Sequence, residues 1–428
     1  MMKNYAVIGL QWGDEGKGKI VDILSEKIKM TVRYQGGHNA GHTVIIGEKK
    51  IVLHLIPSGI IHKDTIAIIE RGVVIDPFEF LKEVKELEKT GIESKGRLFI
   101  SKDAHLILPY HSYFDELMEE IRGTDKIGTT KRGIGPSYED KYGRRGIRVS
   151  SLLNLEILKE EIDFSVRLKN IFLKGAGKQQ INPEDMYSRL TEIRNEIMEY
   201  IGDTMVMIKK AHESEKPILF EGAQGSLLDI DYGTYPFVSS SSPTAGGILT
   251  GGAAGDISSL KTIGIVKAYA TRVGRGAFPT EDFTEKGDML REKGKEFGAT
   301  TGRPRRCGWL DLFALKYSTY ISGVKSIVLT KIDILDSFDK IKVCIGYKYK
   351  GKKLDNFPTE RWILDSVEPE YIELDGWKTS TSGITEYEKL PENTKKYIEF
   401  IEDYLKVNAI IVSTGPARRE TILRENIF

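Results

Sequence analysis

The sequence predicts an α/β protein with a mostly parallel central sheet, a phosphate-loop-like first turn and a helical insert. Three observations support this fold class. Short apolar runs recur along the chain and end in glycine-rich polar loops, as strands of an open parallel sheet do. The apolar run Tyr5–Ile8 leads through one such loop into apolar residues at helical spacing. Residues 151–216 contain few glycines and repeat apolar residues at helical spacing, which predicts a mostly helical insert.

Bulk composition excludes some partners. A net charge of +1 on 428 residues argues against a nucleic-acid coat and against binding to an anionic membrane. No apolar run is long enough to span a bilayer. Cys307 and Cys344 are too few for a disulfide framework, so we expect a reducing, cytoplasmic location.

The loop after the first strand combines a phosphate motif with two acids. Gly13 to Lys19 fits G-x-x-x-x-G-K, but Ile20 replaces the hydroxyl residue that would hold magnesium. Asp14 and Glu15 lie instead where a phosphate should bind. A carboxylate there is repelled unless a cation lies between or it has a proton to take. Asp14 is therefore interpreted as a magnesium ligand, a general base or both; the alternative is that the acids only cap the next helix.

A predicted strand over residues 31–35 leads into a second glycine-rich loop, residues 36–43. Its glycines argue against a helix, so we discount zinc binding by His38 and His42. His42 is favoured for acid chemistry because histidine titrates near neutrality. The alternative is that both histidines only hydrogen-bond to backbone. His54 and His62 lie among apolar residues and are expected to be structural.

The middle of the chain alternates predicted elements with polar loops. Strands are predicted at 66–69, 72–75 and 217–220, and a helix at 77–89. Hydroxyls and cations in the loop 126–138 suit a phosphate, although a plain surface loop is equally compatible. The strand at 217–220 ends in Glu-Gly-Ala-Gln-Gly, residues 221–225, and residues 238–256 are predicted to form a long mobile binding loop.

The C-terminal half contains an arginine loop and a guanine-type motif. Arg303, Arg305 and Arg306 lie in the glycine- and threonine-rich segment 297–309, which suits an anion. A strand predicted at 326–329 precedes Thr-Lys-Ile-Asp, residues 330–333. The Asp333 carboxylate can accept hydrogen bonds from N1–H and the 2-amino group of guanine, a donor pair that adenine lacks.

Three further elements complete the expected sheet. An antiparallel strand is predicted at 341–349, a helix at 394–405 and a last strand at 407–412, followed by a loop at 413–416 on the same sheet edge. The phosphate loop and the guanine-type motif lie more than 300 residues apart, with no well-placed D-x-x-G between them. A nucleotide used as a reagent therefore fits better than a molecular switch.

Several of these stretches together resemble the adenylosuccinate synthetase family, along nearly the whole chain. The matching residues are Gln-Trp-Gly-Asp-Glu-Gly-Lys-Gly-Lys at 11–19, Arg-Tyr-Gln-Gly-Gly-His-Asn-Ala-Gly-His-Thr at 33–43, Glu-Gly-Ala-Gln-Gly at 221–225, Gly-Ala-Thr-Thr-Gly-Arg at 298–303, Thr-Lys-Ile-Asp at 330–333 and Ser-Thr-Gly-Pro at 413–416.

The resemblance implies one large α/β domain over residues 1–428, a homodimer and one Mg²⁺ per subunit. It implies formation of adenylosuccinate from IMP and L-aspartate, with GTP converted to GDP and phosphate through a 6-phosphoryl-IMP intermediate. That reaction is the first committed step of AMP biosynthesis from IMP. Asp14 would remove the N1 proton of IMP, and His42 would act as the acid.

The resemblance also assigns site residues by position. The catalytic residues would be Asp14, His42, Lys17 and Gln224, and the Mg²⁺ ligands Asp14 and the carbonyl of Gly41. GTP would contact Gly13, Asp14, Glu15, Gly16, Lys17, Gly18, Lys19, Gly41, His42, Thr43, Arg305, Lys331, Ile332, Asp333, Ser413, Thr414 and Gly415. IMP would contact Asp14, Glu15, Gly16, Lys17, Asn39, Ala40, Gly41, His42, Thr130, Gln224, Ser239 and Arg303, with Arg144 reaching the IMP site of the partner subunit. Aspartate would contact Ala299, Thr300, Thr301, Gly302, Arg303, Pro304 and Arg305.

The chain departs from the family pattern at three positions. Ser239 stands where threonine is expected, Lys131 where a small residue is expected, and Pro304 where arginine is expected. None removes a group that the chemistry requires. Two alternative functions are considered. A catalytically idle nucleotide-binding regulator has no need of Asp14, His42 and the arginine loop together, and all three are present. An ATP-dependent phosphoryl transferase is disfavoured by Asp333.

Overall fold

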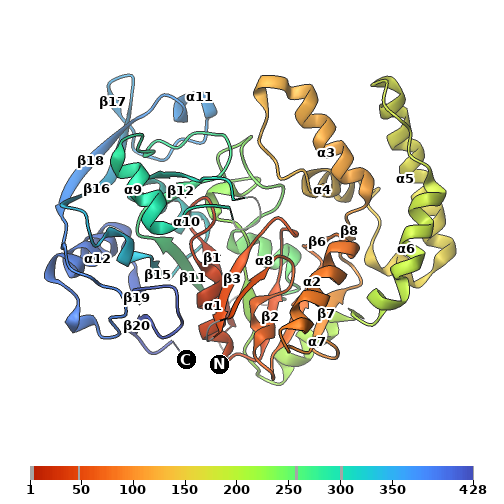
Figure 1. Ribbon diagram of the computed structural model, residues 1–428, viewed down its shortest axis with the longest axis horizontal. Helices are drawn as coiled ribbons and strands as arrows, with labels where there is room; N and C mark the ends of the chain where they lie inside the picture. Colours follow the sequence, from red (N-terminus) through yellow and green to blue (C-terminus); the bar gives the residue numbers. More distant parts are fainter. Residues whose placement is uncertain (1–3, 47–48, 256–258, 299–301, 428) are drawn as a thin grey trace.

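Ten strands form one central sheet in the computed structural model, which describes residues 4–46, 49–255, 259–298 and 302–427 (Figure 1). Their order is β20-β19-β15-β11-β1-β10-β2-β5-β7-β9. All neighbours pair in parallel except β20, which runs antiparallel to β19. The strands are β1 (Asn4–Gly9), β2 (Met30–Arg33), β5 (Ile66–Ile69), β7 (Leu98–Ser101), β9 (Ile201–Gly202), β10 (Leu219–Glu221), β11 (Leu260–Lys267), β15 (Ser326–Thr330), β19 (Asn408–Ser413) and β20 (Thr421–Leu423).

Helices cover both faces of this sheet. Along β1, Ala6 and Ile8 join one hydrophobic core while Tyr5 and Val7 join the core on the other face. Residues of α7, α8, α10 and α12 contribute to the first core, and α1 to the second. The helices are α1 (Lys17–Ser25), α2 (Pro77–Lys89), α3 (Pro109–Arg122), α4 (Ile134–Tyr142), α5 (Leu155–Gly175), α6 (Pro183–Met198), α7 (Thr204–Glu213), α8 (Ala245–Gly251), α9 (Glu285–Gly294), α10 (Leu312–Ile321), α11 (Arg361–Leu364) and α12 (Glu392–Leu405).

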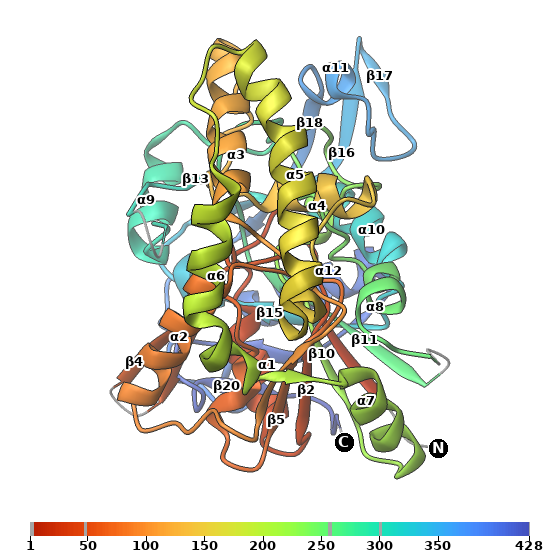
Figure 2. The same ribbon diagram turned by 90° about the vertical axis from the view of Figure 1, so that its right-hand side faces the viewer.

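The predicted fold class is confirmed: a large, mostly parallel α/β sheet with a helical insert. Figure 2 shows α5 and α6 side by side, and in Figure 1 they stand at the opposite end of the molecule from the β16–β18 hairpin. A third hydrophobic core joins them to α2, β5 and β7. Among the described residues, no helix has both the length and the apolar character needed to cross a bilayer.

Smaller strand groups surround the main sheet. A hairpin follows the second glycine-rich loop, and a β14–β16–β17 group with β18 forms a separate sheet. The remaining strands are β3 (His42–Ile46), β4 (Lys49–Leu53), β6 (Val74–Ile75), β8 (His105–Leu106), β12 (Ala270–Arg272), β13 (Arg306–Gly308), β14 (Leu310–Asp311), β16 (Lys340–Tyr349), β17 (Lys352–Lys353) and β18 (Glu368–Asp375).

One predicted loop is wrong in part. The segment 238–256 was expected to be a long mobile loop, but α8 occupies its centre and Ile248 is fully buried. Glycine makes this packing possible, because a Cβ on Gly251 would lie 2.3 Å from the carbonyl oxygen of Tyr34. The composition that suggested a loop instead permits close helix packing.

Three other boundaries differ from the prediction. The loop predicted at 126–138 ends at Gly133, where α4 begins. The loop predicted at 36–43 gives way to β3 at His42, whose hairpin with β4 the sequence analysis missed. The strand predicted at 407–412 is not the last, because β20 follows it and pairs with it in antiparallel orientation.

Parallel pairing places several loops at one edge of the sheet. Six neighbouring strands, β19, β15, β11, β1, β10 and β2, all end there, since the carboxyl ends of parallel strands coincide. The loops after these strands include most of the motifs singled out in the sequence. Segments far apart in sequence therefore meet above one edge.

Candidate active site

A cavity of about 860 Å³ opens at the carboxyl edge of the sheet. Loops after β1, β2, β10 and β15 line one side, and residues of α3 and α4 line another. The predicted site residues that line it are Gly13, Asp14, Gly16, Lys17, Gly18, Asn39, Ala40, Gly41, His42, Thr43, Thr130, Gln224, Ser239, Arg305 and Lys331.

The side chain of Glu15 stabilises the backbone of the phosphate loop to which it belongs. Its carboxylate is fully buried and accepts hydrogen bonds from the backbone N–H groups of Gln11 at 3.1 Å and Gly13 at 2.8 Å. Lys17 pairs with the other carboxylate oxygen at 2.7 Å. Gly16 takes φ +89° just before α1, a conformation that glycine adopts readily. The Glu15 side chain therefore shapes the loop, whereas Asp14 faces the cavity.

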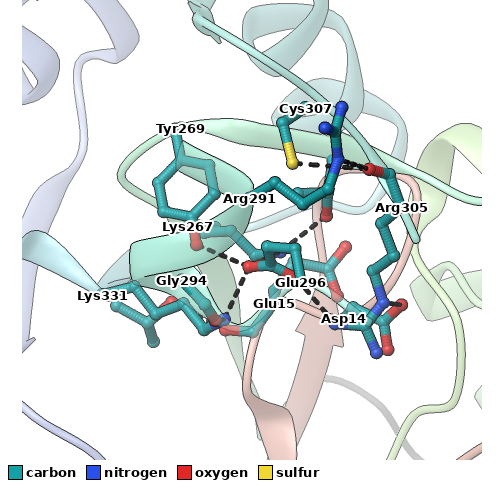
Figure 3. Close-up of polar contacts among 12 residues, drawn as sticks. Asp14, Glu15, Lys267, Tyr269, Arg291, Gly294, Glu296, Arg305, Cys307 and Lys331 are labelled. Carbon is teal, nitrogen blue, oxygen red and sulfur yellow. Dashed lines mark hydrogen bonds and ion pairs between the residues drawn. The ribbon is translucent and has the colours of Figure 1, made fainter. Parts of the chain in front are cut away.

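Asp14 is partly exposed and pairs with the arginine loop. Its Oδ2 lies 3.0 Å from Nε of Arg305, and both residues line the cavity. Figure 3 shows Asp14 and Arg305 adjoining the cluster around Glu296. An acid in a phosphate-type loop is thus balanced by a cation from a distant segment.

Four of the predicted site residues other than glycine adopt the left-handed backbone region. The φ angles are +61° at Asp14, +53° at Gln224, +58° at Lys331 and +60° at Arg144. Non-glycine residues adopt this region rarely, and such strain is concentrated at functional sites. The surrounding structure must hold these residues in place.

His42 forms a buried dyad with Glu221. Its Nδ1 lies in a short contact with Oε1 of Glu221, and Ser58 donates to the same carboxylate from its backbone N–H at 2.7 Å and its hydroxyl at 2.9 Å. Burial lowers the pKa of His42, and the adjacent carboxylate only partly offsets this. Because Nδ1 is engaged, Nε2 is the nitrogen left for a ligand in the cavity.

A side-chain amide pair lies beside the dyad. Nε2 of Gln224 donates to Oδ1 of Asn39 at 3.2 Å, while Oε1 of Gln224 is buried without a partner among the described residues. The hydroxyl of Ser239 lies 3.1 Å from that of Ser241. These groups offer donors and acceptors to a polar ligand.

The guanine-type motif is bonded directly to the phosphate loop. The Thr330 hydroxyl donates to the carbonyl of Glu15 at 2.7 Å. One carboxylate oxygen of Asp333 is buried without a hydrogen-bond partner in the described chain. Burial raises the pKa of Asp333 to about 6. An unsatisfied buried acceptor at this position is suited to a ligand with two adjacent donors.

Lys19 holds the C-terminal loop. Its ammonium donates at 2.8 Å to the Ser413 hydroxyl and to the carbonyls of Gly415 and Glu420. Burial lowers its pKa to about 8. This lysine of the phosphate loop is therefore used to position the 413–415 loop. The remaining residues predicted near the base, Ile332, Thr414 and Gly415, are buried.

Other predicted residues lie away from the cavity. Arg144 and Arg303 are exposed and do not line it, and the same holds for Gly302 and Pro304. Ala299, Thr300 and Thr301 lie outside the described residues. Two of the residues that depart from the family pattern have defined contacts. Lys131 forms an ion pair with Glu116 at the surface, and Pro304 forms an isolated antiparallel β-bridge with Phe297.

The sequence analysis missed two organising carboxylates. Glu221 was noted only as part of a glycine-rich motif, although its place at the end of a strand was a usable signal. Glu296 pairs with residues up to 35 positions away, and no local pattern marks it.

An open parallel sheet with a phosphate loop, a base-recognition motif and ionisable groups facing one cavity defines a nucleotide-using α/β enzyme. The sequence profile described as "Adenylosuccinate synthetase" matches residues 6–422. The chain belongs to the adenylosuccinate synthetase family, and it is a ligase of purine nucleotide biosynthesis that joins IMP and aspartate.

Relatives and solved structures agree over the full length. The adenylosuccinate synthetase of Thermodesulfovibrio yellowstonii is 50% identical, covering 99% of this chain and 100% of that protein. The fully ligated adenylosuccinate synthetase of Plasmodium falciparum superposes with a TM-score of 0.92 at 38% identity, covering 99% of this chain and 100% of that one. The succinoaminodeoxyadenylate synthetase of cyanophage S-2L, at 17% identity and TM-score 0.62, shares the fold; it covers 100% of this chain and 97% of its own.

The buried dyad predicts that His42 in the ligand-free protein is less protonated at pH 6 than a free imidazole, with the proton of the neutral ring on the nitrogen that faces Glu221. Burial lowers the pKa of His42 in the folded protein. In the unfolded chain the same ring binds a proton near pH 6.5, whereas in the folded protein it binds a proton only at lower pH. The free energy of unfolding should therefore fall as the pH drops below 6.5. Long-range ¹H–¹⁵N spectra of ring-labelled protein, with H42Q for assignment, would show the neutral pattern. An imidazolium pattern at pH 6 would contradict the expectation.

Proposed function

We propose that this ligase uses GTP to activate IMP, forming 6-phosphoryl-IMP, and that L-aspartate then displaces the phosphate. The observation that carries the proposal is that Asp14, in the phosphate-type loop, and His42, at the start of β3, line one cavity. Asp14 would serve as the base for the purine, and His42 as the acid for the charge that develops on the γ-phosphate.

Guanine selection is supported by Lys331 and Asp333. The carboxylate of Asp333 has an unpartnered buried oxygen, and guanine offers N1–H and its 2-amino group to a carboxylate. Adenine would leave this acceptor unsatisfied. The bond from Thr330 to the phosphate loop fixes the distance between the base and phosphate subsites.

The first chemical step moves one proton and one phosphoryl group. Asp14 takes the N1 proton of IMP, O6 attacks the γ-phosphorus, and the bond to the β-phosphate oxygen breaks to release GDP. Negative charge from the triphosphate raises the pKa of His42, and Glu221 stabilises the resulting imidazolium. The protonated ring then donates to the transferring group.

The second step replaces the phosphate. The aspartate amine attacks C6, the C6–O6 bond breaks with release of phosphate, and the amine loses a proton. Gln224, Asn39, Thr130 and Ser239 line the cavity and would hold IMP. The loop ending at Arg305 would hold the two carboxylates of aspartate, because guanidinium groups bind carboxylates bidentately.

The donor set fits one Mg²⁺. The Asp14 carboxylate and the Gly41 carbonyl are oxygen ligands on the same cavity. The remaining ligands would come from the phosphates and water, because Mg²⁺ is usually bound by one or two carboxylates together with substrate phosphates. When bound, Mg²⁺ would neutralise phosphate charge next to Asp14.

We further propose a cytoplasmic homodimer. Both cysteines are free and buried, which suits a reducing compartment. Arg144 projects at the surface in a left-handed turn, away from the cavity of its own chain. That placement supports its contribution to the partner subunit's IMP site.

Replacing the proposed base should separate binding from turnover. D14N keeps the size of the side chain but cannot take the proton, so kcat should fall about 10³-fold. GDP binding, measured without Mg²⁺ so that the loss of a metal ligand has no effect, should remain measurable. Succinyl-purine formation is followed by absorbance, omitting IMP, aspartate or GTP in turn, and GDP binding by calorimetry. The exposed D64N variant is the matched control. Near-normal turnover of D14N would remove Asp14 as the base.

Replacing Asp333 should change which nucleoside triphosphate the enzyme prefers. D333N replaces an acceptor with an amide donor, so preference should move from GTP toward xanthosine triphosphate, whose 2-oxo group accepts. In the unchanged protein, KM for GTP should rise below pH 6, because a protonated Asp333 accepts poorly. If the enzyme uses ATP and GTP equally well both before and after the substitution, Asp333 does not select guanine.

Two inactive variants should restore activity together if the site is shared. In a hybrid of R144L with D14N, one of the two sites keeps both native residues. Random exchange of equal amounts should therefore recover about a quarter of the native rate. Absence of recovery, with hybrids verified by mass, would exclude a contribution from the partner subunit.

A further inference from the structure

The buried carboxylate of Glu296 accepts hydrogen bonds from four side chains. Its Oε1 accepts from Lys331 at 2.6 Å, Lys267 at 3.1 Å and the Tyr269 hydroxyl at 2.5 Å, and its Oε2 accepts from Arg305 at 2.6 Å (Figure 3). The carboxylate has 0% exposure and Lys267 has 1%. A buried charge of this kind is tolerated only with such partners.

The surroundings of Glu296 favour its ionised form. Burial alone would raise the pKa of Glu296, but three neighbouring cations lower it well below the usual range. Burial lowers the pKa of Lys267, opposed by the Glu296 charge. Without this carboxylate, Lys267 and Lys331 would lose the anion they share, and Arg305 would keep only its ion pair with Asp14.

Glu296 lies at the base of the arginine loop. Its carbonyl accepts from the backbone N–H of Arg305 at 2.9 Å, and the next residues along, Phe297 and Pro304, form an isolated bridge. Glu296 therefore holds Arg305 through both backbone and side chain. Arg305 in turn reaches Asp14 with its Nε at 3.0 Å.

Glu296 also fixes the lysine of the guanine-type motif. The ammonium of Lys331 is shared between Glu296 and the carbonyl of Gly294, at 2.9 Å. It lies 6.0 Å from the ring centre of Tyr269. Lys331 has a left-handed backbone and keeps 30% of its side chain exposed toward the cavity. Its orientation thus depends on the buried carboxylate behind it.

We propose that Glu296 is a positioning residue that sets two subsites at once, the guanine subsite through Lys331 and the aspartate subsite through Arg305. This inference rests on the proposed function. A glutamine at this position would offer one acceptor oxygen and direct N–H donors toward a cation, so at least one of the two side chains would lose its position.

Steady-state kinetics of E296Q test this role. KM for GTP and KM for aspartate should both rise about tenfold, while KM for IMP stays within about twofold. E281Q is the matched control, because the Glu281 carboxylate pairs with the neighbouring Arg306 instead of with Lys331 or Arg305. The control should leave all three constants unchanged.

A second, milder variant tests the same role if E296Q fails to fold. Y269F removes one hydroxyl from the same carboxylate oxygen and should raise the GTP and aspartate constants in the same direction, about threefold. Equal changes in all three constants, a loss of thermal stability with unchanged constants, or no effect in either variant would overturn the proposal. If the unchanged protein forms no product, the proposed function fails instead, and the two failures are distinguished.

Discussion

A fully buried carboxylate must be surrounded by donors, and three of them organise this site. Glu15 holds the phosphate loop and Lys17, Glu221 holds His42 and Ser58, and Glu296 holds two lysines and Arg305. Each has 0% exposure. The cost of burying such a charge without partners is several kcal/mol, at least about 3. Each carboxylate therefore fixes the groups around it in one geometry, and each holds at least one residue that lines the cavity: Lys17, His42, and Lys331 with Arg305.

These clusters connect segments far apart in sequence. The amide of Gln11, in the phosphate loop, bonds to the backbone of Lys267 and Tyr269 at the end of β11. Thr330 bonds to the same loop from the end of β15. Parallel pairing brings the strand ends together, and the polar bonds then set the loops against one another. The phosphate-type loop and the guanine-type motif are therefore joined at one edge of the sheet.

Local patterns allowed much of the fold to be predicted. The strand at Tyr5–Ile8, the helix at Pro77–Lys89 and the parallel sheet follow from apolar periodicity and glycine-rich turns, which are local signals. The roles of Asp14 and Asp333 also rested on local motifs. Glu296 escaped prediction because its partners come from several segments. The helix α8 escaped because its glycines suggest a loop unless the close approach of Tyr34 is known.

The ends of the central sheet limit how it can associate. One border is β20, with three residues, and the other is β9, with two. Such short border strands expose few unpaired backbone groups, so another chain has little template on which to add a strand. Self-association by sheet extension is thereby disfavoured on both sides, and the proposed dimer would have to form through side-chain surfaces such as those of the helices.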